Sequence, residues 1–221
     1  MPRPPAPAPP ASDPHVSESP RSSPRAANHR LSADARREQI LDVALEVFGQ
    51  AGFHGASMND VADAAGVTKP VLYQHFDSKR ELYRALLDEV GNRLLSAISK
   101  ATADAPDGRS QTQRGFQAYF RWVSEDHDEF KLLYGGGTRR DDEFRGAIRR
   151  ITDEAANAIA PLIAVDIESE HRRTIAHALV GLAEGASRRL VEMGEPFDPD
   201  EVARQVSDLA WAGLRVVHRV G

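Results

Sequence analysis

Apolar residues recur along most of the chain at the spacing of an α-helix. The first such stretch ends at Gly52 and places one stripe on a single face, formed by Ile40, Leu41, Ala44, Val47, Phe48 and Ala51. No segment alternates apolar and polar residues for long enough to indicate a β-strand. The pattern therefore predicts an all-α fold.

Capping residues mark where the next helices begin. Ser57, with an aspartate three residues later, predicts a capping box and a short helix. Thr68 is expected to cap a second short helix that carries a proline in its first turn, where a missing N–H costs little. Ser78 begins a long helix. Beyond Pro106 we predict a larger helical bundle, with helices over residues 110–126, 128–134, 139–163, 168–193 and 198–219.

The two short helices and the turn between them have the dimensions of a DNA-reading helix-turn-helix. In such a unit the second helix enters the major groove, and Gly66 can supply the positive φ of the turn. The inside can be filled by Val61, Ala62, Ala65, Val67, Leu72 and Phe76. The residues left to face outward, whose types suit base edges and phosphates, are Thr68, Lys69, Pro70, Tyr73, Gln74 and His75.

Charge is distributed unevenly along the chain. Residues 1–30 carry four arginines against two carboxylates, nine of the 14 prolines, and no Leu, Ile or Phe. Such a segment cannot bury enough apolar surface to offset its ordering entropy, so we predict a disordered arm, with a minor-groove contact by Arg25 or Arg30 as the alternative. Residues 33–86 hold six basic and eight acidic side chains, so the net charge of this segment does not predict DNA binding. Only the positions of individual basic side chains can indicate it.

Three segments resemble the DNA-binding domain of TetR-family transcriptional regulators. They are Gly52-Phe53-His54-Gly55-Ala56-Ser57, Val61-Ala62-Asp63-Ala64-Ala65-Gly66-Val67 and residues 68–83, TKPVLYQHFDSKRELY. The turn glycine, LYxHF and SKxxL follow in the family's order and spacing. The resemblance implies a three-helix DNA-binding domain over residues 31–86 and an effector-binding and dimerisation domain over residues 87–221.

The resemblance also implies roles for individual residues. Positions that hold phosphates are matched by Tyr73, His75 and Lys79, and the helix N-terminus at Ser57 offers further backbone N–H groups. Positions that approach base edges are matched by Thr68, Lys69, Pro70 and Gln74. We therefore expect a sequence-specific regulator of transcription, a repressor, whose partner is a double-stranded DNA operator. The residues themselves do not distinguish repression from activation.

The C-terminal region carries the signals for an effector and for dimerisation. Apolar and small residues over 175–190 and 202–217 fit an internal core or, as the family implies, a homodimer seam. KPVLYQHF with Trp211-Ala212-Gly213-Leu214 resembles the mycobacterial branch that controls fatty-acid synthesis, which implies a long-chain acyl effector. Half of the chain's 14 aromatic residues could be core or could line an apolar effector pocket: Phe116, Tyr119, Phe120, Trp122, Phe130, Tyr134 and Phe144.

Other function classes fit the sequence less well. Asp126-His127-Asp128-Glu129, which we interpret as a solvated segment between helices, and His171 with its neighbouring glutamates lack the spacing of a recognised metal or acid-base site. We expect no enzyme, no metal and no cofactor. The absence of Cys excludes disulfides, and no apolar run approaches the roughly 20 residues of a membrane span, so we expect a cytoplasmic protein. A helical adaptor that dimerises but ignores DNA is the remaining alternative.

Overall fold

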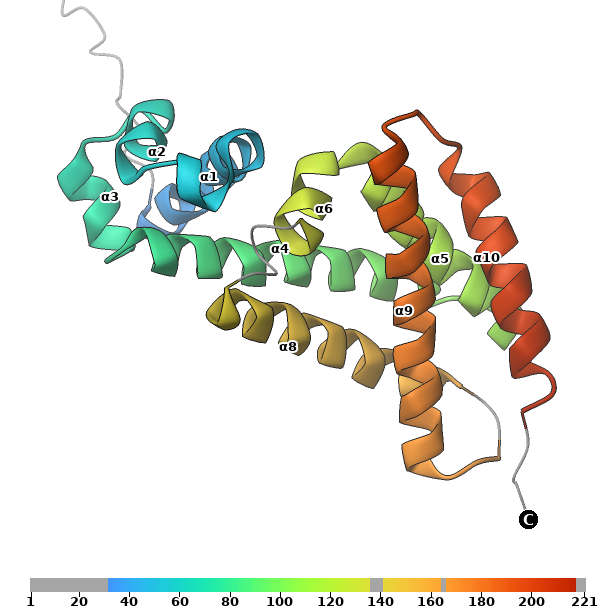
Figure 1. Ribbon diagram of the computed structural model, residues 1–221. Coiled ribbons are helices and arrows are strands. Elements are labelled where there is room, and N and C mark those ends of the chain that lie inside the picture. Colours follow the sequence, from blue (N-terminus) through green and yellow to red (C-terminus); the bar gives the residue numbers. More distant parts are fainter. Residues whose placement is uncertain (1–31, 136–140, 164–165, 218–221) are drawn as a thin grey trace, which may run out of the picture.

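The computed structural model describes residues 32–135, 141–163 and 166–217, and over these ranges the chain is helical with no strand, as predicted (Figure 1). The predicted arm over residues 1–30 and the glycines after 135 lie outside the described residues. Within the same ranges no helix combines the length and apolarity needed to cross a membrane. The elements are, in order, α1 (Ala33–Gly55), α2 (Met58–Ala64), α3 (Lys69–His75), α4 (Lys79–Thr102), α5 (Gly108–Glu125), α6 (His127–Tyr134), α8 (Asp142–Ile159), the 3-10 turn η1 (Ala160–Leu162), α9 (Ser169–Met193) and α10 (Pro199–Leu214).

Three helices depart from the predicted boundaries. The last one, expected over residues 198–219, ends at Leu214, and residues 215–217 are not helical. The first helix was expected to end at Gly52, where the backbone does leave the helical region at φ 68°, yet a further turn continues to Gly55. The segment predicted as one helix over residues 139–163 divides into α8 and η1. Pro161 explains the division, because proline has no backbone N–H to continue an α-helix.

Helix α4 joins the two ends of the molecule. Figure 1 shows it running from the α1–α3 unit into the distal bundle, with α8 beside it and α5 packed near its far end. The hydroxyl of Ser78 accepts a hydrogen bond from the Glu81 backbone N–H at 3.1 Å, so the predicted start is confirmed. Because α4 passes the expected domain boundary near residue 86 without a break, a displacement of its far half also moves the end that carries the α1–α3 unit.

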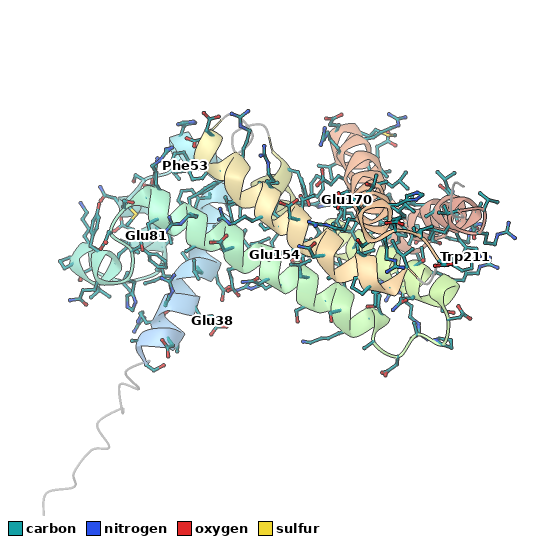
Figure 2. All side chains as sticks on the ribbon, turned by 90° about the horizontal axis from the view of Figure 1, so that it is seen from below. Glu38, Phe53, Glu81, Glu154, Glu170 and Trp211 are labelled. Atoms are coloured by element: carbon teal, nitrogen blue, oxygen red, sulfur yellow. The ribbon has the colours of Figure 1, made fainter. Side chains whose placement is uncertain are left out.

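Helix α8 begins against the N-terminal unit. The ring of Phe144, fully buried, lies 4.8 Å from that of Phe53 and 4.6 Å from that of Tyr83 between centroids. Figure 2 shows Phe53 beside the first turn of α8. Arg80 lies 5.1 Å from the Phe144 ring and forms an ion pair with Asp141 at 2.5 Å. These contacts fix the start of α8 to both α1 and α4.

The last two helices turn small residues inward. Their buried positions are Ala176, Ala183 and Ser187 on α9 and Ala203, Ser207 and Ala210 on α10. Larger apolar side chains stay at least partly on the surface, including Leu182 and Leu209, the latter 64% exposed. The outer faces of α9 and α10 therefore carry apolar surface that the described part of this chain does not cover.

Gly91 marks a close approach of α4 and α8. A Cβ atom at this position would lie 2.7 Å from both Cγ1 and Cδ1 of Ile151. We predict that Gly91→Ala lowers the free energy of unfolding by about 1–3 kcal/mol, because overpacking outweighs the gain of roughly 1 kcal/mol in helix propensity. Denaturant unfolding measures the change.

Gly146 in α8 is the matched control for this substitution. A Cβ atom there would meet nothing within 4 Å, so Gly146→Ala should leave the stability unchanged or raise it by up to about 1 kcal/mol. Equal stabilisation by both substitutions would contradict the close approach at Gly91.

Candidate functional site

The turn between α2 and α3 is built around Gly66. Its φ is 63°, and the N–H of Val67 donates to the carbonyl of Ala62 at 3.0 Å. This is the bonding of a helix end closed by a glycine in the left-handed region. Val61 and Leu72 are fully buried beneath the turn, which fixes α3 with its opposite face outward.

The N-terminus of α2 is a complete capping box, as predicted. The Ser57 hydroxyl accepts from the Asp60 N–H at 3.2 Å, and the Asp60 carboxylate accepts from the Ser57 N–H at 2.8 Å. The shorter aspartate thus serves in place of the preferred glutamate. The Ser57 hydroxyl also donates to Asp60 at 2.8 Å, so this side chain is already engaged within the protein.

The outer face of α3 carries the residues that the sequence placed there. Tyr73 is 47% exposed, His75 is half-buried, and the exposed remainder are Thr68, Lys69, Pro70 and Gln74. The expectation that the Thr68 side chain caps α3 is wrong, since its hydroxyl makes no capping bond. Pro70 removes one of the backbone N–H groups that an N-cap side chain normally accepts from. The Thr68 hydroxyl is therefore left on the surface beside Lys69.

Lys79 has a role within the fold that sequence reasoning missed. Its Nζ donates to the carbonyls of Phe53 and Ala56 at 2.7 and 2.8 Å, and it lies 4.5 Å from the centre of the Phe53 ring. The ammonium group thus satisfies carbonyls at the end of α1 and ties them to the start of α4. Only one of its three N–H donors is left for a phosphate.

Two other basic residues of the unit, Arg37 and Lys69, differ in whether their charged groups already contact other parts of the protein. Arg37 donates to the His75 carbonyl at 3.3 Å and lies 4.2 Å from the centre of the Phe76 ring, so it braces α3 from α1. Lys69 is exposed and has no ion pair within the ranges that the structure describes. Placement rather than total charge therefore makes Lys69 the available cation of α3.

Six of the seven aromatic residues proposed for the effector form one continuous series of ring contacts, which we call the ring series. Successive centroids lie 6.2, 5.4, 5.8, 6.2 and 5.1 Å apart along Phe116, Phe120, Tyr119, Trp122, Phe130 and Tyr134. All six side chains are buried in α5 and α6. Phe144, the seventh, does not join them, because it lies in the contact between α8 and the N-terminal unit.

A buried carboxylate connects the ring series with α1. The indole N–H of Trp122 donates to Glu129 at 2.5 Å, and Arg93 of α4 lies 3.7 Å from the other Glu129 oxygen. Arg93 also donates to Asp42 of α1 at 2.7 Å and to Glu89 at 2.9 Å. Burial raises the pKa of Glu129, while the Trp122 bond and Arg93 oppose the rise. Side chains from α5, α6, α4 and α1 thus form one network.

The position of Glu129 corrects the interpretation of residues 126–129 as a solvated segment. α6 begins at His127, and Glu129 is buried with Leu132 and Leu133. Their spacing of three and four residues puts Glu129 on the apolar face of a helix, which was the available signal in the sequence. Asp126 and His127 are exposed, as expected.

Known families match both halves of the chain. The family described as "Bacterial regulatory proteins, tetR family" matches residues 40–86, and "Tetracyclin repressor-like, C-terminal domain" matches residues 109–213. The HTH-type transcriptional activator FasR of Mycolicibacterium smegmatis is 34% identical over 188 residues, which cover 84% of this chain and 86% of the relative. The chain belongs to the TetR family.

Solved structures agree with this assignment. A TetR-like transcriptional regulator from Rhodococcus sp. RHA1 has a TM-score of 0.68 at 30% identity, covering 85% of this chain and all of that one. FadR from Bacillus subtilis, solved in complex with stearoyl-CoA, has a TM-score of 0.70 at 18% identity over 80% of this chain and 98% of its own, which shows a shared fold. This chain is therefore a DNA-binding, ligand-responsive transcriptional regulator. Because FasR is an activator, family membership is compatible with control in either direction.

Proposed function

We propose that this chain binds a double-stranded operator as a homodimer through the outer face of α3, and that an apolar effector among the rings of α5 and α6 changes this binding. The observation that carries the proposal is the network from Trp122 to Asp42. Two hydrogen bonds and one ion pair in this network connect a side chain of the ring series with the first helix of the DNA-binding unit. The activity is regulatory, with no catalytic step.

The exposed residues of α3 support separate roles in DNA binding. Lys69 and Gln74 carry donors and acceptors that suit base edges, and Thr68 and Pro70 lie at the same end of the helix. Tyr73 and His75 suit phosphates, with Lys79 adding its remaining donor and the α2 N-terminus at Ser57 adding backbone N–H groups. Phosphate contacts position a protein on DNA, whereas base contacts discriminate sequences.

An acyl chain is the effector that the ring series suits best. The series is buried, apolar and long, so a ligand that parts these rings gains apolar contact along its length. The stearoyl-CoA complex of the Bacillus subtilis protein with the same fold supports an acyl compound as the ligand class. Phe144 is excluded from this proposed site because its ring serves the contact with Phe53 and Tyr83.

The uncovered faces of α9 and α10 support the homodimer. A Cβ atom at Gly181, Gly185 or Gly213 would meet nothing within 4 Å, so a partner helix can approach these positions closely. Leu209 and Met193 add exposed apolar area nearby in the same helices. Exposed apolar side chains and open glycines on two successive helices fit a surface that a second copy of the chain covers.

Coupling between effector and operator follows from α4 and the Glu129 network. Two recognition helices of a dimer dock together only at a separation of about 34–36 Å, so a pivot of α4 alters operator affinity. An effector that binds tenfold more tightly at one separation of the recognition helices couples the effector and operator sites by about 1.4 kcal/mol. Operator DNA must then change the affinity for the effector by the same factor. Gel shifts with the DNA upstream of the chain's own gene, with and without stearoyl-CoA, test the proposal. No operator-specific shift, or a shift indifferent to every acyl compound tried, would contradict it.

Substitutions on α3 should separate base readout from phosphate binding. Lys69→Ala and Gln74→Ala should each change the preferred bases at a cost of about 1–3 kcal/mol on the wild-type operator. Tyr73→Phe should weaken binding to all sequences alike, because its hydroxyl contacts phosphate. Selection from random DNA measures both effects, with Lys100→Ala at the far end of α4 as the control. An unchanged motif for Lys69→Ala together with a changed motif for Tyr73→Phe would reverse these roles.

Leu209→Arg should yield a folded monomer. Its side chain is 64% exposed, so the charge perturbs the single chain little but enters the proposed seam without a partner. Leu182→Arg acts on the same seam, although Leu182 also packs on the core. Light scattering and circular dichroism report mass and folding, and Ala97→Arg on exposed α4 surface is the control. Native dimer mass for folded Leu209→Arg would place the contact elsewhere.

Glu129→Gln should uncouple the effector from the operator. The amide keeps an acceptor for Trp122 but removes the charge that faces Arg93, so effector affinity should stay near that of the wild type. The effect of stearoyl-CoA on operator affinity should fall by about fivefold or more, the scale of a typical coupling energy. Glu125→Gln, which is exposed at the end of α5, is the control. Full coupling in stable Glu129→Gln protein would refute the network's role.

A further inference from the structure

Two buried hydroxyl groups lie together at the contact of α5 and α9. Tyr119 is 6% exposed and Ser187 is fully buried, and within the described residues neither Tyr119 Oη nor Ser187 Oγ makes a hydrogen bond of good geometry, although the two hydroxyls lie close enough to interact with each other. A buried polar group without a partner destabilises a fold, so such groups are rare in native proteins. Here two of them occur together in one region.

Further polar groups surround this pair. Burial raises the pKa of Tyr119, and the hydroxyls of Ser187 and Tyr134 and the charge of Arg188 lie near enough to oppose the rise. Arg188 Nε is also buried without a partner among the described residues. The carboxylate of Glu184, which likewise acts on Tyr119, accepts from Thr152 of α8 at 3.5 Å. The groups without a well-formed hydrogen bond are thus the hydroxyls of Tyr119 and Ser187 and the Nε–H of Arg188, and each of them can donate a hydrogen bond.

The position of Tyr119 links these donors to the ring series. Its ring lies 5.4 Å from that of Phe120 and 5.8 Å from that of Trp122, whereas its hydroxyl is directed to the α9 side with Ser187. A ligand that lies along the rings would therefore have one polar point near the middle of an apolar surface. Three donors at that point call for an acceptor, and a carbonyl or carboxylate oxygen has the lone pairs to receive them.

We propose that Tyr119 and Ser187 bind an acyl oxygen of the effector, with Arg188 as an additional donor, while the alkyl chain lies along the ring series. The inference rests on the proposed effector site and names the atoms that hold its polar group. It selects amphiphiles with a carbonyl or carboxylate over hydrocarbons of equal length. A site that hydrogen-bonds an oxygen rejects an analogue without it, because the buried donors are then left unpaired.

Stability without any ligand separates binding hydroxyls from structural ones. Tyr119→Phe and Ser187→Ala remove buried hydroxyls that no well-formed hydrogen bond holds within the described residues, so the denaturation midpoint should stay unchanged or rise. Ser78→Ala is the control, since this serine caps α4 by accepting a hydrogen bond from the Glu81 N–H at 3.1 Å, and its midpoint should fall. A fall for Ser187→Ala as large as that of the control would assign the hydroxyls to the fold and overturn the inference.

Ligand discrimination tests the site directly. Calorimetry with stearoyl-CoA and with its S-octadecyl thioether, which lacks the carbonyl, should give a preference of about fivefold to tenfold for the thioester in the wild type. Tyr119→Phe with Ser187→Ala should remove that preference while leaving the thioether affinity unchanged. Phe116→Leu should weaken both ligands alike. If the double variant still prefers the thioester over the thioether, the inference is overturned but the proposed function is not.

Binding of stearate shows whether the donors bind a carboxylate or a thioester oxygen. It also allows a failure of the proposed function to be told apart from a failure of the inference. Tighter binding of stearate than of stearoyl-CoA, weakened by Arg188→Gln, assigns the donors to a carboxylate; the reverse order assigns them to a thioester. Either result supports the inference. If the wild type binds neither acyl compound nor the thioether, the acyl effector of the proposed function fails and the inference fails with it.

Discussion

The cost of burying the Glu129 carboxylate constrains how the two halves of this protein are held together. A charge removed from water is stable only with bonded partners, and Glu129 finds them in the Trp122 indole and the Arg93 guanidinium. Arg93 in turn holds Asp42 of the DNA-binding unit. Because Glu129 and Trp122 are buried, a movement of α6 away from Arg93 would leave the carboxylate without its cationic partner, so this contact ties α6 to α4.

A second contact acts on the same unit from a different helix. Phe144 of α8 packs against both Phe53 and Tyr83, whose rings also contact each other, and α6 contacts α1 as well. The α6 side approaches closely as well, because a Cβ atom on Gly49 would lie 2.8 Å from Asp128 Cγ. Changes in the distal bundle therefore reach the α1–α3 unit through packed and bonded contacts on two sides of α4.

Local signals predicted most of the fold, whereas contacts between distant helices could not be predicted in the same way. Ser57 and Ser78 were recognisable as caps because a cap involves residues within one turn, and Gly66 was recognisable because its turn requires a positive φ. Lys79 and Phe144 escaped the same reasoning, since their partners come from helices distant in the chain. A resemblance assigns Lys79 a position on DNA, but only the packed structure shows two of its donors already used.

Helix α9 connects the effector region with the proposed dimer seam. Ser187 lies on its buried face beside Tyr119, whereas Gly181 and Gly185 lie on its exposed face, within two turns of the same rigid helix. A group that binds Ser187 must adjust α9 against α5, and in a dimer that adjustment also moves the seam about which the two subunits are oriented. Separation of the recognition helices then depends on α4 within each subunit and on α9 between subunits. An effector binds more tightly to the dimer arrangement in which the Tyr119 and Ser187 hydroxyls reach its oxygen. This difference in effector affinity between the two arrangements selects one of them over the other.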